Sequence, residues 1–268
     1  MAGQADNDIL LSELTDGILR LTLNDNQRRN ALSTEMLARL SAAFTEAADD
    51  VRVRVVVLAA TGPVFCSGHD LKEMTAARAE SDKGHEAYQQ LFAACASVMQ
   101  LIVRNPKPVI AEVAGVATAA GCQLVASCDL AMASNTAQFA TPGVNLGLFC
   151  STPMVALSRN VGRKHAMEML LGGDMVDASR AEQIGLINRA FEADQLTAET
   201  MAIALKIASK STMTIAIGKR AFYEQAEMPL KEAYAYTSQV MTENMLTRDA
   251  DEGIGAFLEK RSPKWEDQ

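Results

Sequence analysis

The feature that most restricts the fold is a pair of predicted buried strands, residues 51–60 (VRVRVVVLAA), which becomes fully apolar, and residues 109–115 (VIAEVAG). Strands that are apolar on both faces are typical of parallel sheets buried between helices. Parallel neighbours need a long crossover connection, which is usually a helix. Residues 84–104, between the two runs, have the length and apolar spacing of such a helix. The sequence therefore predicts an α/β fold with crossover connections.

The pattern continues on both sides of these runs and then changes. Further strands are expected at 8–14, 17–23, 130–134 and 137–141, and a helix begins at Ser33-Thr34. From residue 155 onward the pattern is almost wholly helical, with helices expected at 155–161, 163–171, 178–184, 193–210, 213–225, 229–246 and 249–259. We expect a mixed core over residues 1–200 and a helical region over 201–268.

Composition excludes several classes of partner. The chain of 268 residues is 49% hydrophobic and carries a formal net charge of -8. A nucleic-acid partner usually requires a basic face, so none is expected. No apolar stretch reaches about 18 residues, so we expect no membrane partner. An anionic small ligand stays compatible with the charge, because a few local Lys and Arg residues can bind phosphates.

The cysteines and the N-terminus bear on the compartment. There are five cysteines, an odd number, and no pair has the spacing of metal ligands. We therefore expect reduced thiols and no metal. The first residues, MAGQADNDILLSEL, lack the basic start and apolar run of a signal peptide and are too acidic for a transit peptide. These features predict a cytoplasmic protein. No Gly-rich phosphate-binding fingerprint follows any predicted strand, which disfavours hydride and phosphoryl transfer.

Two loops of small residues are the strongest candidates for chemistry. Residues 66–69 (CSGH) and 117–122 (ATAAGC) each follow a predicted buried strand and directly precede a helix. The first N–H groups of a helix have no partner within it and attract a negative oxygen. Side by side, the two loops could form a two-donor oxyanion hole. The alternative is that both are simply close-packing turns.

A resemblance supports the first interpretation. "VFCSGHDLKEM" (64–74), "GVATAAGCQLVASCDLAMAS" (115–134) and "AQFATPGVNLGLF" (137–149) resemble, in order and spacing, three segments of the crotonase (enoyl-CoA hydratase/isomerase) superfamily. The "NAL" at 30–32 and the ending "AFLEKRSPKW" (256–265) fit as well, so the resemblance covers roughly residues 10–265. "SGHDLKE" and "ATAAGCQLVASCD" are most similar to one subgroup of that superfamily.

The resemblance implies a fold and a ligand. The fold would be an α/β spiral of ββα units over residues 1–200, with a C-terminal helical trimerisation region over 201–268. The N–H groups of Ser67 and Ala120 would bind a thioester carbonyl and stabilise its enolate. The partner would be an acyl-CoA thioester, with coenzyme A as part of the substrate and no covalently bound cofactor. The chain would form a homotrimer or a hexamer.

The resemblance also implies contacts to coenzyme A. The backbone of Ser67, Gly68, His69, Asp70 and Leu71 would surround the adenine and pantetheine groups. The candidates for the phosphates are Arg28, Arg29 and Lys72, and those that would reach the ligand of a neighbouring subunit are Phe257 and Lys260.

Two departures from the family pattern affect the expected reaction. Hydratases of this superfamily carry two catalytic glutamates, and the matching positions here are Gln123 and Gly143. A Gln amide does not titrate near neutral pH, and Gly has no side chain. Hydration is therefore expected to be weak or absent.

Several alternatives stay open. His69 is a candidate for decarboxylase or isomerase chemistry, or it lines the coenzyme A site or caps a helix. Cys150 and Ser151 fall where the acyl end should lie, and Cys150 as a nucleophile would need a partner base. The chain could also be a non-catalytic acyl-CoA-binding module, or a true hydratase with acids from other positions.

Overall fold

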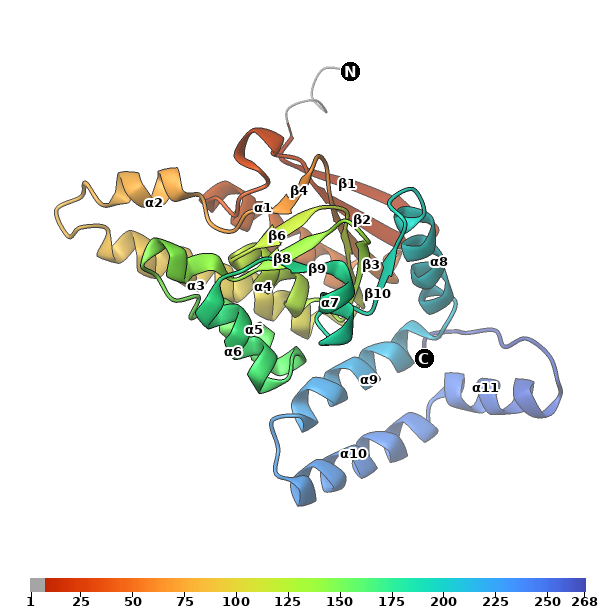
Figure 1. Ribbon diagram of the computed structural model, residues 1–268. Coiled ribbons are helices and arrows are strands. Elements are labelled where there is room, and N and C mark those ends of the chain that lie inside the picture. The colour runs from red at the N-terminus through yellow and green to blue at the C-terminus, as the bar shows by residue number, and fades with distance from the viewer. Residues whose placement is uncertain (1–7) are drawn as a thin grey trace.

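The strands form two sheets, as Figure 1 shows for the computed structural model, which describes residues 8–268. The larger sheet has the order β1-β2-β3-β5-β7-β10 and the smaller one β4-β6-β8-β9. Their strands are β1 (Leu10–Thr15), β2 (Ile18–Leu23), β3 (Val55–Ala60), β4 (Val64–Cys66), β5 (Val109–Val113), β6 (Val116–Thr118), β7 (Leu130–Ser134), β8 (Gln138–Ala140), β9 (Val176–Asp177) and β10 (Arg189–Phe191). All neighbours are parallel except β1–β2 and β8–β9.

The core is a repeated ββα unit, which confirms the expected spiral. In each unit the first strand (β3, β5 or β7) enters the larger sheet and the second (β4, β6 or β8) enters the smaller one. The helical elements that follow are α2 (Leu71–Ala77), α3 (His85–Arg104), α4 (Ala120–Ser127), η3 (Pro142–Leu146) and α5 (Pro153–Asn160). Because β4, β6 and β8 are parallel neighbours, the three segments that follow them emerge at one edge of the small sheet.

Helices cover both faces of the larger sheet. On one face α1 (Thr34–Asp49) and α3 bury side chains such as Phe44 and Ile102 against Val56 and Leu58. The Ser33 hydroxyl caps α1 by accepting the N–H of Met36. On the other face α8 (Leu196–Ala208) packs its buried residues against a separate cluster of Ile18, Val55, Val57, Ile110 and Met132. The core is completed by η2 (Asn26–Arg28), α6 (Arg163–Gly172) and α7 (Ala178–Gln183).

Two strand predictions differ from the structure. The strand expected at 51–60 begins only at Val55, because residues 50–54 form a turn in which Val51 is 87% exposed. The Arg52 guanidinium, 2.7 Å from the Asp50 carboxylate, stabilises this turn and lowers the pKa of Asp50 to about 2. The short strands β9 and β10 were not expected, and they lie in the gaps between the expected helices 163–171, 178–184 and 193–210. Two or three residues are too few to show a strand period in sequence.

The helical region begins later than expected. Residue 200 lies inside α8, which belongs to the core, so the transition follows Ala208. The region consists of α9 (Thr212–Gln225), α10 (Leu230–Met245) and α11 (Arg248–Leu258), which extend away from the sheets (Figure 1). Lys219 anchors α9 to the core: its Nζ lies 2.6 Å from the Asp129 carboxylate and donates to the carbonyls of Ile102 and Lys107.

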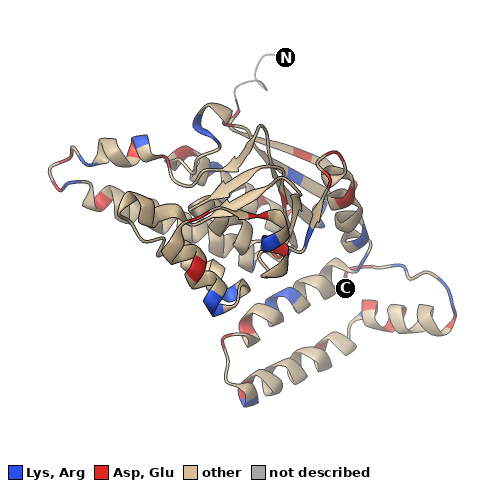
Figure 2. Cartoon of the chain, in the orientation of Figure 1, with Lys and Arg blue, Asp and Glu red and all other residues tan. Residues whose placement is uncertain are grey.

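Charge is spread over the helices and loops. In Figure 2 Lys and Arg are interspersed with Asp and Glu, and the central strands carry few of either. Within residues 8–268 no single helix has the length and apolarity to cross a bilayer; α8 and α9 together would have them, but a bend of 102° separates the two.

Candidate active site

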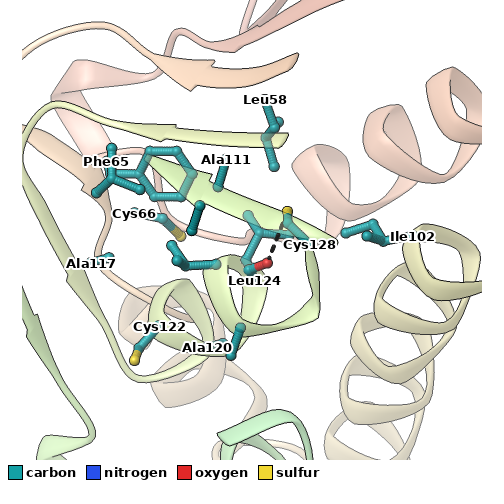
Figure 3. Packing of buried hydrophobic residues seen from close by; sticks show 14 of the residues in the cluster. Leu58, Phe65, Cys66, Ile102, Ala111, Ala117, Ala120, Cys122, Leu124 and Cys128 are labelled. Carbon is teal, nitrogen blue, oxygen red and sulfur yellow. Dashed lines mark hydrogen bonds between the residues drawn. The ribbon is translucent and has the colours of Figure 1, made fainter. Parts of the chain in front are cut away.

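The three segments that resemble the family motifs meet at the edge of the small sheet. Register pairs Cys66 with Ala117 and Thr118 with Ala140. The N–H of Ala119 donates to the carbonyl of Ala140 at 2.9 Å. A Cβ placed on Gly68 would lie only 2.9 Å from the Cβ of Ala119, so the first two segments are in direct contact. Figure 3 shows Phe65, Cys66 and Ala117 beside α4, which carries Ala120, Cys122 and Leu124.

The N–H of Ala120 is free to bind a ligand. Ala120 is the first residue of α4, so this N–H has no partner within the helix. It has no hydrogen-bond acceptor elsewhere in residues 8–268 either. The preceding residue, Ala119, has φ 52° and ψ -120°, a backbone conformation that is costly for a residue with a Cβ. Its hydrogen bond to Ala140 holds it there and directs the start of α4.

The expected donor on the first segment, the N–H of Ser67, is not free in the structure. The N–H of Ser67 donates to the carbonyl of Arg29 at 3.2 Å, and is therefore already paired. The N–H of His69 has no acceptor in the described part of the chain. A Cβ on the intervening Gly68 would lie 3.2 Å from the nitrogen of Ala120. The two free N–H groups that the structure brings together are those of His69 and Ala120.

The His69 imidazole is held in one orientation and is neutral. Its Nδ1 lies 3.4 Å from the carbonyl of Leu32, and its ring meets that of Phe92 edge-on, with centroids 5.5 Å apart. Burial lowers the pKa of His69 below its ordinary value of 6.5. A carbonyl oxygen only accepts, so Nδ1 carries the proton and Nε2 is left with a lone pair. Nε2 is buried and has no partner within residues 8–268.

The positions expected to correspond to the hydratase glutamates, Gln123 and Gly143, are both buried. Gln123 is 4% exposed, and its Oε1 has no hydrogen-bond partner in the described residues. A Cβ on Gly143 would lie 2.9 Å from the Sγ of Cys150 and 2.8 Å from the carbonyl oxygen of Leu148. The thiol of Cys150 thus occupies the space next to Gly143 that a longer side chain would need.

The alternative nucleophile and the neighbouring hydroxyl gain no support. Burial raises the pKa of the Cys150 thiol, so it stays protonated near neutral pH. No base contacts it among the hydrogen bonds of residues 8–268. Ser151 is exposed, and its hydroxyl donates to the carbonyl of Phe149 at 3.4 Å. Cys150 is thus buried and packed beside Gly143, and its expected place in the wall of the acyl site stays a prediction.

Some of the residues expected to contact coenzyme A are already engaged within the chain, namely Asp70 and Arg28, whereas others, such as Leu71 and Lys72, are exposed. Asp70 caps α2, because its Oδ1 accepts the N–H of Lys72 at 2.8 Å. The Arg28 guanidinium is already surrounded by carboxylates: Asp70 at 3.5 Å, Glu73 at 3.6 Å and Asp25 at 3.8 Å. Lys72 and Leu71 are exposed, and Arg29 has a left-handed backbone, with its carbonyl paired to Ser67.

Phe257 and Lys260 lie far from this site in the same chain. Phe257 is near the end of α11 and Lys260 directly follows that helix, which lies at the opposite end of the molecule from α2 (Figure 1). Phe257 is 81% exposed. Within one chain the structure therefore does not bring them to this site, and their expected role toward a neighbouring subunit stays a prediction.

Sequence reasoning missed one polar residue. Thr141 directly follows β8, is 1% exposed, and its Oγ1 lacks a partner within residues 8–268. Its position in the sequence was the available signal. Thr141 follows β8 of the small sheet, and His69 comes shortly after β4 of the same sheet.

Comparison with known proteins identifies the family and the fold. The sequence model of the family described as enoyl-CoA hydratase/isomerase matches residues 13–268. A relative from Mus musculus, enoyl-CoA hydratase domain-containing protein 3, mitochondrial, is 49% identical over 93% of this chain and 82% of its own length. A crystal structure of an enoyl-CoA hydratase from Mycobacterium smegmatis superimposes with a TM-score of 0.92 at 52% identity, covering 97% of this chain and 99% of that one. The human enoyl-CoA hydratase domain-containing protein 3 also has a TM-score of 0.92, at 47% identity, with 96% and 100% coverage.

The names of these relatives overturn one expectation. Five vertebrate relatives, 46–49% identical to this chain, are named mitochondrial. The cytoplasmic location expected from the N-terminus is therefore contradicted. An apparent lack of a targeting signal is a weak guide, because such segments are recognised by composition alone and differ between related chains.

Fold, motifs and similarity agree along the chain. The two-sheet spiral matches the solved structures, and the family match includes all three segments that build the site. The subgroup indicated by "SGHDLKE" and "ATAAGCQLVASCD" is that of enoyl-CoA hydratase domain-containing protein 3. This chain belongs to the enoyl-CoA hydratase/isomerase family, the crotonase superfamily.

Proposed function

We propose that this protein is an acyl-CoA-binding enzyme that holds the thioester carbonyl between the N–H groups of His69 and Ala120 and stabilises its enolate. The observation that carries the proposal is that both donors lack an acceptor within residues 8–268 while their segments are in direct contact. The dipole of α4 adds to the donor at Ala120. Preorganised donors of this kind can each lower the barrier by about 3 kcal/mol.

Hydration of an enoyl-CoA is proposed to be weak or absent. The reaction needs one group to take a proton from water and another to give a proton to carbon. Gln123 cannot do either near neutral pH, and Gly143 has no side chain. The protonated thiol of Cys150, which fills the space beside Gly143, is no substitute. Each missing group removes a factor of about 10²–10⁴ in rate.

Coenzyme A would bind as part of the substrate along the segment from Gly68 to Lys72. The backbone there is bent by the left-handed Gly68 and exposed from Leu71 onward. Lys72 and Arg29 are the better candidates for phosphates, because three carboxylates already surround Arg28.

We also propose a homotrimer or hexamer. The C-terminal helices expose large apolar side chains, among them Phe222, Leu246, Phe257 and Leu258 at 63–83%. Exposed apolar groups of this extent mark an interaction surface. In such an assembly Phe257 and Lys260 would reach the site of a neighbouring subunit.

Two alternatives have specific support. The neutral imidazole of His69, with a free Nε2 beside the proposed oxyanion site, favours proton transfer or decarboxylation at the acyl chain. The absence of both carboxylates favours a non-catalytic acyl-CoA-binding module instead. Both alternatives share the premise that the N–H groups of His69 and Ala120 together bind a thioester carbonyl.

The test combines binding and turnover. Calorimetry with butyryl-CoA and free coenzyme A measures the thioester contribution, and a spectrophotometric assay with crotonyl-CoA measures hydration. The comparison variants are Gln123→Glu alone and Gln123→Glu with Gly143→Glu and Cys150→Ala. A Glu at 143 needs the space of the thiol, and it also requires the backbone carbonyl of Leu148, 2.8 Å from the added Cβ, to shift, so the folding of the triple variant is checked by its Tm. We expect binding by the wild type and a large gain of hydration only in the triple variant. Ordinary hydratase rates in the wild type, near the typical enzyme value of about 10 s⁻¹, would contradict the argument. Failure to bind either ligand would overturn the proposal.

A further inference from the structure

A hollow of about 680 Å³ lies where α8 bends into α9. Residues of β7, β10, α8 and α9 line it, so it lies on the face of the larger sheet that α8 covers. The proposed thioester site is elsewhere, at the edge of the small sheet. Ligand cavities in proteins typically measure about 300–1,000 Å³. The hollow therefore has the volume of a ligand site that the proposed function does not use.

The floor of the hollow is apolar. Met132 of β7 is 3% exposed and belongs to the hydrophobic cluster beneath α8, and Ile203 and Ile207 of α8 pack against that cluster. Ile215 of α9 completes the apolar lining. These side chains would bury an alkyl chain, and each CH₂ group removed from water strengthens binding about fourfold.

The charged side chains at the hollow are all cations. Arg189 lies directly opposite Met132 in the register of β10 with β7. Lys206 and Lys210 are four residues apart where α8 ends, so both extend from the same side of the helix. No carboxylate of residues 8–268 lines the hollow, and none of the three cations forms an ion pair within that part of the chain.

Other cations on the same face of the sheet have partners. Arg20 pairs with Glu112 at 2.6 Å beneath α8. Arg54, beside the bend, donates to the carbonyl of Lys210 at 2.7 Å and pairs with Asp267 at 3.2 Å. The three cations at the hollow lack such a carboxylate, and a local group of unpaired cations attracts an anion even in a chain of net charge -8.

We propose that this hollow binds an amphipathic anion, a single apolar chain that ends in a carboxylate or a phosphate. The anionic group lies among Arg189, Lys206 and Lys210, and the chain lies over the floor formed by Met132 and the isoleucines. A purely solvated patch of lysines would need no apolar floor, and a purely apolar ligand would leave the cations unpaired. The hollow is separate from the thioester site, so binding here does not depend on the proposed function.

Trp265 provides a spectroscopic probe next to the hollow. It is the single tryptophan of the sequence, and its Nε1–H donates to the carbonyl of Ser209 at 2.9 Å. Ser209 lies between Lys206 and Lys210, and Figure 1 shows the C-terminal end of the chain beside the junction of α8 and α9. A ligand at the bend should therefore change the fluorescence of Trp265.

The test is a titration of the full chain with decanoate, decyl phosphate, decanol and acetate, below their critical micelle concentrations and with saturating butyryl-CoA to occupy the thioester site. Calorimetry and Trp265 fluorescence measure binding. The test variant is Lys206→Gln with Lys210→Gln. The matched control is Arg163→Gln with Lys164→Gln, which removes the same charge from exposed positions at the start of α6.

We expect decanoate or decyl phosphate to bind about tenfold or more tightly than decanol and acetate, and to change the fluorescence of Trp265. The tighter of the two anions identifies the anionic group. The Lys206/Lys210 variant should weaken anion binding about fivefold or more, as expected for the loss of two partly exposed charge pairs, and the control less than twofold.

Equal binding of decanol and decanoate, or equal effects of the two variants, would overturn the proposal. It would also be overturned if the Lys206/Lys210 variant left binding unchanged but altered the oligomeric state in light scattering, because a second copy of the chain would then cover the hollow. If butyryl-CoA does not bind, the proposed function fails, while the comparison of the two variants still decides whether the hollow binds the anion.

Discussion

Replacing Gly68 by alanine should separate the two donor segments without removing any polar group. Gly68 has φ +92°, which is costly for a residue with a Cβ. The new Cβ would lie 2.9 Å from the Cβ of Ala119, where ordinary contacts begin at 3.4 Å, and 3.2 Å from the nitrogen of Ala120. The segments must therefore move apart by roughly 0.5 Å or more, which changes the spacing of the two N–H groups.

The matched control is Gly185→Ala. Gly185 has φ +82°, but its added Cβ would meet only the Asn160 carbonyl at an ordinary 3.5 Å. Both variants pay the left-handed backbone cost of about 1–2 kcal/mol. For 268 residues, an unfolding entropy of about 2.1 cal/mol/K per residue converts each kcal/mol into about 2 °C of Tm. The control should therefore lose about 2–4 °C, and Gly68→Ala should lose a further 2–5 °C from about 1–3 kcal/mol of overpacking.

The assays are differential scanning calorimetry and titration with butyryl-CoA and free coenzyme A. Gly68→Ala should weaken butyryl-CoA binding about tenfold or more relative to the control, and free coenzyme A less, because only the thioester has the carbonyl. The reasoning is refuted if Gly68→Ala behaves like Gly185→Ala in both Tm and the ratio of the two affinities.

Two further predictions concern stability. Glu112 is 4% exposed in the central strand β5, and it accepts two hydrogen bonds from Arg20, at 2.6 and 2.9 Å, and one from Thr197. Glu112→Gln should lower the free energy of unfolding by about 2–3 kcal/mol, which is less than for a fully buried pair because Arg20 is partly exposed. Scanning calorimetry should show this as a fall of about 4–6 °C in Tm. The control Glu199→Gln, at an exposed position, should change Tm by less than about 1 °C, and equal shifts in the two variants would rule the mechanism out. His69 has a folded pKa below its ordinary 6.5, so as pH falls through 6.5 the unfolded chain takes up a proton that the folded chain does not, and stability is lost. The Tm of the wild type should therefore fall between pH 8 and pH 5.5 more steeply than that of His69→Gln, while the exposed His85→Gln should follow the wild type; parallel curves for all three would show that His69 is not the group responsible.

Local patterns in the sequence were enough for most of the fold. The apolar run at 109–115 predicted β5, and the helical spacing of residues 84–104 predicted α3 almost to its ends. Apolar periodicity is a property of neighbouring residues, so it can be read without knowing what packs against them. The ends of elements were harder to place: the alternating residues 51–54 (VRVR) were included in the predicted strand, but they form a turn in which Asp50 and Arg52 pair with each other.

Only part of the candidate site could be predicted from the sequence. The spacing of small residues before two helices pointed to the segments around His69 and Ala120, and the resemblance implies that Gln123 and Gly143 stand where hydratases carry two carboxylates. The choice of Ser67 as a donor failed because its N–H pairs with the carbonyl of Arg29, on a loop that precedes β3. The sequence around Ser67 or around Arg29 does not indicate that these two residues form a hydrogen bond.

The sequence by itself thus determined which residues are chemically able to take part. It contains small residues that would let a ligand approach the backbone, a Gln side chain that does not titrate, and apolar segments that form buried strands. The assembled fold settled which groups are free to act. In the folded chain the N–H of Ser67 is hydrogen-bonded, whereas the N–H of His69 has no acceptor within residues 8–268. Folding also places Cys150 in the space beside Gly143. Whether a donor is free depends on every atom around it, and those atoms come from segments that are distant in the chain and adjacent only after folding.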